Sequence, residues 1–120
     1  MGRRLGQHFL RNPKVSRRIV EALDLREGDT VIEVGAGRGE LSRELLQNIF
    51  SGNLIAIEKD LQLVQQLARN FKFLISNVKS IPNVRMLKSQ NILIHGDVLE
   101  TLPEITAGLK RGYKLIGNIP

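Results

Sequence analysis

Three alternating glycines, Gly35, Gly37 and Gly39, follow the largely apolar run 31–34 and precede a helix-forming run that begins at Glu40. Glycine reaches positive φ angles and lets a ligand approach the backbone where a Cβ would block it. A glycine turn that joins a strand to a helix is therefore typical of a nucleotide-binding site at the helix N-terminus. The alternative is a glycine-rich turn that binds no ligand.

The spacing of the turn bears on the charge of its ligand. A dinucleotide-binding fingerprint, G-x-G-x-x-G, requires a glycine where this chain has Glu40. That carboxylate would repel a pyrophosphate, and Glu33 before the turn adds a second negative charge. The pattern disfavours a nicotinamide-dependent oxidoreductase and favours a ligand that carries an amine and a sulfonium, such as S-adenosylmethionine.

Two further acids end predicted strands. Glu58 follows the apolar run 54–57, and its carboxylate could accept two hydrogen bonds from a ribose diol; the alternative is a surface acid paired with Lys59. Asp97 follows the run 91–95 and could accept from an exocyclic amino group such as that of adenine. Its alternative role is that of a turn cap.

Two other polar residues near these positions, His95 and Arg38, are expected to have structural rather than catalytic roles. His95 is expected to pack or to satisfy a turn rather than to catalyse, and Arg38 is expected to face solvent or Glu33.

The elements that position these residues alternate between strands and helices. Strands are predicted at 30–34, 54–57, 91–95 and 113–116, and helices from Pro13 to about Asp24, from Glu40 to Ser51-Gly52-Asn53, from Leu61 through Val78, and at 99–109, the last begun or interrupted at Pro103. The basic connection 84–90 is not assigned. This alternation predicts an α/β fold with right-handed crossovers and a parallel sheet, in which ligands bind beyond the carboxyl ends of the strands.

Length, composition and charge limit the number of domains, the kinds of site and the partners that this chain can have. A chain of 120 residues is one domain at most. The absence of cysteine excludes disulfides and thiolate metal sites, and no apolar run reaches the ~18 residues of a membrane span. The net charge of +6 includes six basic residues and no acid within residues 1–20. This arm favours a polyanionic partner such as nucleic acid, although a solvated basic helix face is the alternative.

The chain resembles the ribosomal RNA adenine N6-dimethyltransferase family, which also includes the erythromycin-resistance methylases. The resemblance lies in five segments, which occur in family order: Gly6-Gln7-His8-Phe9-Leu10, Glu33-Val34-Gly35-Ala36-Gly37-Arg38-Gly39, Ile57-Glu58-Lys59-Asp60, His95-Gly96-Asp97 and Gly117-Asn118-Ile119-Pro120. It implies a Rossmann-like S-adenosylmethionine-dependent methyltransferase fold and dimethylation of adenine N6 in small-subunit ribosomal RNA.

The resemblance also implies roles for single residues. The cofactor-binding set would be His8, Leu10, Gly35, Gly37, Glu58, Asp97 and Asn118. Asn118 and Pro120 begin the catalytic Asn-x-Pro-aromatic motif, in which the asparagine oxygen accepts a hydrogen bond from the target amine. Basic residues of the amino-terminal region, Arg3, Arg4, Arg11 and Lys14, would contact RNA phosphates. No metal is implied.

The resemblance also implies how the chain is divided and that it is part of a longer catalytic domain. We expect residues 1–24 to form a basic arm and first helix, and residues 25–120 to form the amino-terminal part of the catalytic domain, truncated after the fourth strand. The expected partner is small-subunit ribosomal RNA or a pre-ribosomal subunit, the expected compartment is the cytoplasm, and the full-length form is expected to be a monomer without membrane contact. The 120 residues alone are expected to be inactive. The alternative function is a non-catalytic nucleic-acid-binding factor that retains the methyltransferase fold.

Overall fold

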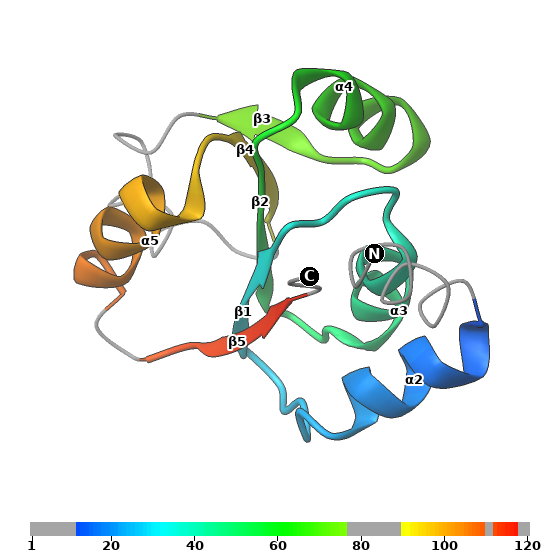
Figure 1. The fold of residues 1–120 in the computed structure, drawn as a ribbon. Coiled ribbons are helices and arrows are strands. Elements are labelled where there is room, and N and C mark those ends of the chain that lie inside the picture. Colours follow the sequence, from blue (N-terminus) through cyan, green and yellow to red (C-terminus); the bar gives the residue numbers. More distant parts are fainter. Residues whose placement is uncertain (1–11, 77–89, 110–111, 118–120) are drawn as a thin grey trace.

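The computed structural model describes residues 12–76, 90–109 and 112–117, which form a parallel sheet between helices (Figure 1). The strands are β1 (Thr30–Val34), β2 (Asn53–Glu58), β3 (Leu74–Ser76), β4 (Asn91–His95) and β5 (Lys114–Gly117). The helices are α2 (Pro13–Glu21), α3 (Glu40–Asn48), α4 (Leu61–Asn70) and α5 (Val98–Ala107). The strand order is β3-β4-β2-β1-β5, and every pairing is parallel. The predicted α/β class and parallel sheet are confirmed.

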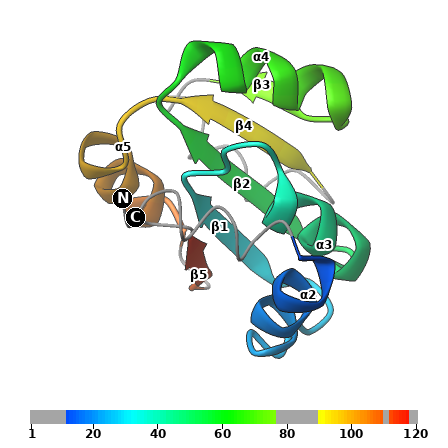
Figure 2. The same cartoon turned by 45° about the vertical axis from the view of Figure 1, so that its right-hand side comes forward.

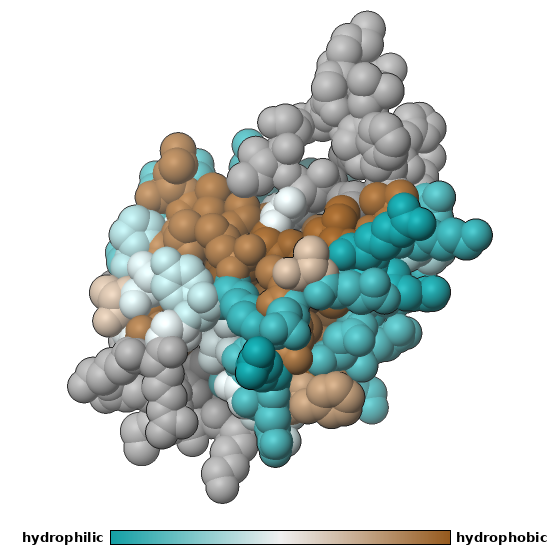
Figure 3. Space-filling model, turned by 90° about the horizontal axis from the view of Figure 1, so that it is seen from below, coloured by the Kyte–Doolittle hydropathy of each residue, from teal (hydrophilic) through white to brown (hydrophobic). Residues whose placement is uncertain are grey.

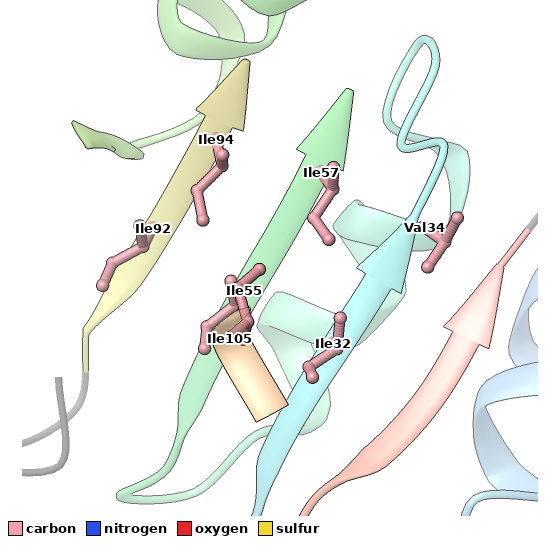
Figure 4. Packing of buried hydrophobic residues seen from close by; sticks show 7 residues of the cluster. All are labelled: Ile32, Val34, Ile55, Ile57, Ile92, Ile94 and Ile105. Carbon is pink, nitrogen blue, oxygen red and sulfur yellow. The ribbon is translucent and has the colours of Figure 1, made fainter. Parts of the chain in front are cut away.

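Helix α5 covers one face of the sheet. Because successive side chains of a strand point to opposite faces, alternate residues of β1, β2 and β4 meet this helix. They are joined by Ile105 of α5 in one apolar cluster (Figure 4), whose buried members are Ile32, Val34, Ile55, Ile57, Ile92, Ile94 and Ile105. Branched aliphatic side chains of this kind suit a strand that is buried on both faces.

Helices α2, α3 and α4 cover the opposite face, as the turned view shows (Figure 2). The intervening residues of the same strands supply this second interface. Leu54 of β2 packs with Leu41 and Leu45 of α3, whereas Leu93 of β4 packs with Leu67 of α4. The sheet is therefore the middle of three layers.

The chain changes direction at β1. From β1 it adds β2, then the edge strand β3 and then β4 between β2 and β3, and it finally returns to add β5 on the free side of β1. In sheets of this kind ligands bind beyond the carboxyl ends of the strands at such a reversal, here between β1 and β5. The glycine turn begins there, directly after Val34.

The predicted long helix from Leu61 through Val78 is wrong beyond Asn70. Helix α4 ends there, and Leu74–Ser76 forms the short edge strand β3 beside β4. Phe71 takes an extended conformation (φ −131°, ψ 156°) that ends the helix. The apolar residues at 74 and 75 fit a helical period but are exposed in the strand, and Val78 lies outside the described residues.

The remaining differences concern element ends and the numbering of strands. Helix α2 ends at Glu21 rather than near Asp24, whose φ of 50° is left-handed. Helix α5 continues through Pro103 without interruption. The strand predicted as the fourth is the fifth in chain order, because β3 precedes it.

β5 lies at one edge of the sheet among the described strands. Its Leu115 is 49% exposed, and Tyr113 just before it is 43% exposed. Seen from below, the molecule shows a broad apolar area bordered by hydrophilic residues, on the side where Figure 1 places β5 and α2 (Figure 3).

An ion pair joins β5 to the turn before β1. The Lys114 Nζ lies 3.0 Å from Asp29 Oδ2 and donates to the Asp24 carbonyl at 2.5 Å. The Arg26 backbone N–H donates to the same Asp29 oxygen at 2.8 Å. This hydrogen bond, followed by the contact with Lys114, holds the pKa of Asp29 below its usual range.

We predict that Asp29→Asn lowers the free energy of unfolding by about 1 kcal/mol at pH 7, because two charge-assisted hydrogen bonds weaken at a half-exposed site. A carboxylate whose pKa is lower in the folded state stabilises the fold at pH values above its unfolded-state pKa. This contribution is lost as the pH falls through the folded-state pKa. The difference between wild type and variant should therefore shrink below about pH 4 in urea titrations. Asp24→Asn is the matched control, since its exposed side-chain pair with Arg26 should contribute almost nothing. An equal loss in both variants would contradict the assignment.

Candidate functional site

The ends of β1, β2 and β4 lie side by side at one edge of the sheet. Val34 pairs with Ile57, and Glu58 pairs with His95. Two backbone hydrogen bonds extend this register past the strands: Gly35 N–H donates to the Ile57 carbonyl at 2.9 Å, and Gly96 N–H donates to the Glu58 carbonyl at 3.0 Å. The predicted residues Gly35, Gly37, Glu58 and Asp97 are thereby brought to one end of the sheet.

The glycine turn depends on backbone conformations that other residues adopt rarely. Gly35, Gly37 and Gly39 have φ angles of 68°, 60° and 91°. Gly39 is the N-cap of α3 and supplies no side-chain cap. The Phe71 ring packs directly against it, because a Cβ built at Gly39 would lie 2.4 Å from Phe71 Cε2. The turn therefore requires glycine for conformation and, at residue 39, for space.

Glu58 holds the turn in place. Its side chain is 7% exposed, its Oε1 accepts from Gly37 N–H at 2.8 Å, and its Oε2 accepts from Asp60 N–H at 2.9 Å. The alternative of a surface acid paired with Lys59 is therefore wrong. Each carboxylate oxygen can accept a second hydrogen bond, so Glu58 keeps the capacity to bind a diol while it fixes the turn.

Glu33 does not add the negative charge that its position suggested. The side chain is 1% exposed, and Ser42 Oγ of α3 donates to its Oε1 at 2.5 Å. Burial raises the pKa of Glu33 to about 8, with the Ser42 hydrogen bond acting against this and the charges of Glu40 and Glu58 adding to it. The group is mostly neutral at pH 7 and belongs to the interface between β1 and α3.

Asp97 caps the following helix. Its Oδ1 accepts from Leu99 N–H at 2.9 Å, and its backbone carbonyl accepts from Thr101 Oγ1 at 2.9 Å. The capping role that the sequence left open is thus present. The exposed carboxylate retains acceptor positions for a ligand amine, so capping and binding are compatible.

His95 and Arg38 match their structural interpretations. The His95 Nε2 lies 2.9 Å from the Lys59 carbonyl, an acceptor, so Nε2 carries the proton. Arg38 is exposed, and it makes no ion pair with Glu33 among the described residues.

Several predicted residues are not placed by the structure. His8, Leu10, Asn118, Pro120, Arg3, Arg4 and Arg11 lie outside the described residues. Lys14 is exposed in the first turn of α2, which packs on α3. Within the described ranges no helix is long and apolar enough to cross a membrane, and no group of three acidic, histidine or cysteine side chains is arranged for a metal ion.

Sequence reasoning missed three contributors to the site. Asp60 caps α4 with Oδ1, a role signalled by an aspartate directly before a helical run. Ser42 and Phe71 gave no such signal, because their contacts join segments distant in the sequence.

Comparison with known proteins places the chain in a family. A model of the ribosomal RNA adenine dimethylase family matches residues 1–120, and the chain belongs to that family. It is 43% identical over 116 residues to the ribosomal RNA small subunit methyltransferase A of Dehalococcoides mccartyi strain BAV1, covering 97% of this chain and 34% of that protein. It is 37% identical over 118 residues to the protein of the same name from Synechococcus sp. strain CC9311, covering 98% and 37%.

A solved structure supports the fold. The crystal structure of a dimethyladenosine transferase from Plasmodium falciparum matches with a TM-score of 0.59 at 20% identity, over 91% of this chain and 32% of that chain. The fold is therefore the Rossmann-like methyltransferase fold that the sequence predicted. The chain spans about a third of the length of the curated relatives it matches.

We predict that Glu33 makes stability fall with rising pH. A carboxyl group whose folded-state pKa is raised stabilises below its unfolded-state pKa, and this contribution is lost as the pH rises through the folded-state value. The free energy of unfolding should therefore fall between about pH 4.5 and the folded-state pKa of about 8, with a slope approaching ~1.4 kcal/mol per pH unit.

Glu33→Gln should remove this decline, since the amide does not ionise and its oxygen can still accept from Ser42. Ser42→Ala should move the upper end of the decline to higher pH, because it removes the hydrogen bond that favours the charged carboxylate. Urea titrations from pH 4 to 9 measure both effects. Identical pH slopes in wild type and Glu33→Gln would contradict the assignment.

Proposed function

We propose that this chain forms the methyl-donor half of an S-adenosylmethionine-dependent enzyme that dimethylates adenine N6 in small-subunit ribosomal RNA. The observation that carries the proposal is the hydrogen bond between Gly37 and the buried Glu58 at the carboxyl end of β2, next to the end of β4 that Asp97 follows. Membership of the ribosomal RNA adenine dimethylase family gives the reaction class.

The described residues fit this cofactor by their chemistry. Glu58 would accept from the two ribose hydroxyls with its remaining lone pairs, and Asp97 would accept from the adenine amino group. Gly35 and Gly37 would allow the methionine part to approach the backbone, where a Cβ would obstruct it. We further propose that His8 and Leu10 close over the cofactor, and that Asn118 lies against it.

When bound, S-adenosylmethionine supplies an electrophilic methyl group on a sulfonium, so the protein needs only to align and polarise the target. We propose that the Asn118 side-chain oxygen accepts a hydrogen bond from the adenine amino group and turns the nitrogen lone pair toward the methyl. Pro120 would fix the backbone of this motif through its restricted φ. The target base must leave its stack to be reached.

RNA would be held mainly through its phosphates. We propose that Arg3, Arg4, Arg11 and Lys14 contact the backbone of ribosomal RNA or of a pre-ribosomal subunit, which contributes salt-dependent affinity without base choice. Such an enzyme would work in the cytoplasm, and we propose that the complete protein is a monomer.

We predict that the complete protein binds S-adenosylmethionine in calorimetry and that Glu58→Ala weakens binding at least about 100-fold. The substitution removes two acceptors for the ribose and also frees the Gly37 N–H, each worth about 1.5–3 kcal/mol when charge-assisted. Asp97→Ala should weaken binding less, because only one hydrogen bond to adenine is lost.

The control is Glu27→Ala, which removes an exposed carboxylate from the turn before β1 and should leave the affinity unchanged. Retained cofactor binding in Glu58→Ala would contradict the assignment of the site. A wild-type protein that binds RNA but no S-adenosylmethionine would favour the alternative of a nucleic-acid-binding factor.

We predict that Asn118→Ala in the complete protein lowers methyl transfer to unmodified small-subunit RNA by about 100-fold or more, a typical loss for one polarising group in a reaction site. Cofactor affinity should change much less than the rate. Transfer of labelled methyl groups in single-turnover reactions measures the first quantity, and calorimetry measures the second. Equal losses of rate and affinity would instead assign Asn118 to cofactor binding.

A further inference from the structure

The carboxyl-terminal end of α4 supports the glycine turn through a direct aromatic contact. A Cβ built on Gly39 would lie 2.4 Å from Phe71 Cε2, 2.9 Å from Phe71 Cζ and 3.1 Å from Leu67 Cδ2. Real Cβ atoms essentially never come as close to a neighbour as the two Phe71 distances, so the Gly39 backbone packs directly against the edge of the Phe71 ring. The contact joins two segments that flank the site and are far apart in the sequence.

Backbone hydrogen bonds and strand pairing hold the segment that carries the Phe71 ring. Phe71 N–H donates to the Leu67 carbonyl at 2.9 Å, and Phe73 N–H donates to the Phe71 carbonyl at 2.9 Å. The rings of Phe71 and Phe73 meet edge to face with centroids 6.2 Å apart. Strand β3, which begins at Leu74, then pairs with β4, so the segment is held from both sides.

A short series of contacts leads from this ring to Glu58. Gly39 N–H donates to the Ala36 carbonyl at 2.9 Å, which closes the turn around Gly37. Gly37 N–H in turn donates to Glu58 Oε1 at 2.8 Å. If the Phe71 ring were absent, Gly39 could move into the space that the ring fills. This movement would change the direction of the Gly37 N–H.

We propose that Phe71 is a positioning residue for the methyl-donor site: its ring holds the glycine turn in the position where the Gly37 N–H donates to Glu58. The inference deepens the proposed function and rests on it. Phe71 touches neither cofactor nor substrate in this role. It acts through Gly39, and its half-buried ring also contributes to the apolar cluster of α4.

The test compares Phe71→Ala and Phe71→Leu with Phe73→Ala in the complete protein. Phe73→Ala is the matched control, since it removes the other ring of the same pair without removing the contact to Gly39. Two quantities are measured: the amide hydrogen exchange of Gly37 and the affinity for S-adenosylmethionine by calorimetry. Unfolding by urea reports stability separately.

We expect Phe71→Ala to accelerate Gly37 exchange and to weaken cofactor binding by about three- to tenfold, the range of one well-packed aromatic contact. Phe71→Leu should have a smaller effect of the same sign. Phe73→Ala should lower stability and leave both quantities near the wild-type values. A purely structural role for Phe71 would lower stability in both alanine variants and spare Gly37 and the affinity.

A double-mutant cycle tests the contact without any ligand. Gly39→Ala alone should be strongly destabilising, because the new Cβ overlaps the ring and a φ of 91° is strained for alanine. In the Phe71→Ala background only the strain remains, so the same substitution should cost clearly less.

The outcomes separate the two proposals. Unchanged Gly37 exchange in Phe71→Ala, equal acceleration in Phe73→Ala, or strict additivity in the cycle would overturn the positioning role. A wild-type protein that fails to bind S-adenosylmethionine, while Gly37 exchange still depends on Phe71, would overturn the proposed function and support the contact.

Discussion

The hydrogen bond from Gly37 N–H to Glu58 is the interaction on which the site depends. It joins the turn after β1 to the last residue of β2 over 2.8 Å, with Gly37 at a positive φ angle that favours glycine. Parallel pairing brings Val34 opposite Ile57, which leaves the turn directly above the end of β2. A second N–H, from Asp60, holds the other oxygen of the same carboxylate. Strand register, glycine conformation and helix capping therefore all converge on one side chain.

Two glutamates on neighbouring strands show how position within a strand determines the role of a carboxyl group. Glu33 is opposite Ala56 within the sheet and is covered by α3, so it loses its solvent and remains mostly neutral at pH 7. Glu58 is the last residue of its strand, where backbone N–H groups of two turns reach it. A carboxyl group that a helix covers becomes part of the core, whereas one at the strand end meets donors and can meet a ligand.

The sequence was sufficient to predict the parallel sheet, strand 30–34 to the residue, and the convergence of Gly35, Gly37, Glu58 and Asp97, because local patterns determine these features. It was insufficient for β3, since Leu74 and Ile75 also fit a helical period and only pairing with β4 distinguishes the two states. The neutral state of Glu33 and the support of Gly39 by Phe71 depend on contacts between distant segments. Such contacts leave no periodic trace in a single sequence.

The opposite end of the sheet contributes to the site through strand register. Lys114, the first residue of β5, forms an ion pair with Asp29 before β1, and the same strand pairing places Gly117 opposite Val34. A shift of one residue would turn every β5 side chain to the other face and move the strand end relative to the glycine turn. Asn118, which follows Gly117 in the sequence, is proposed to act in methyl transfer, a reaction that requires the donor and acceptor atoms within about 3–3.5 Å of each other. In the proposed function, an ion pair at one end of β5 would therefore help to keep the other end of the strand in register with the glycine turn.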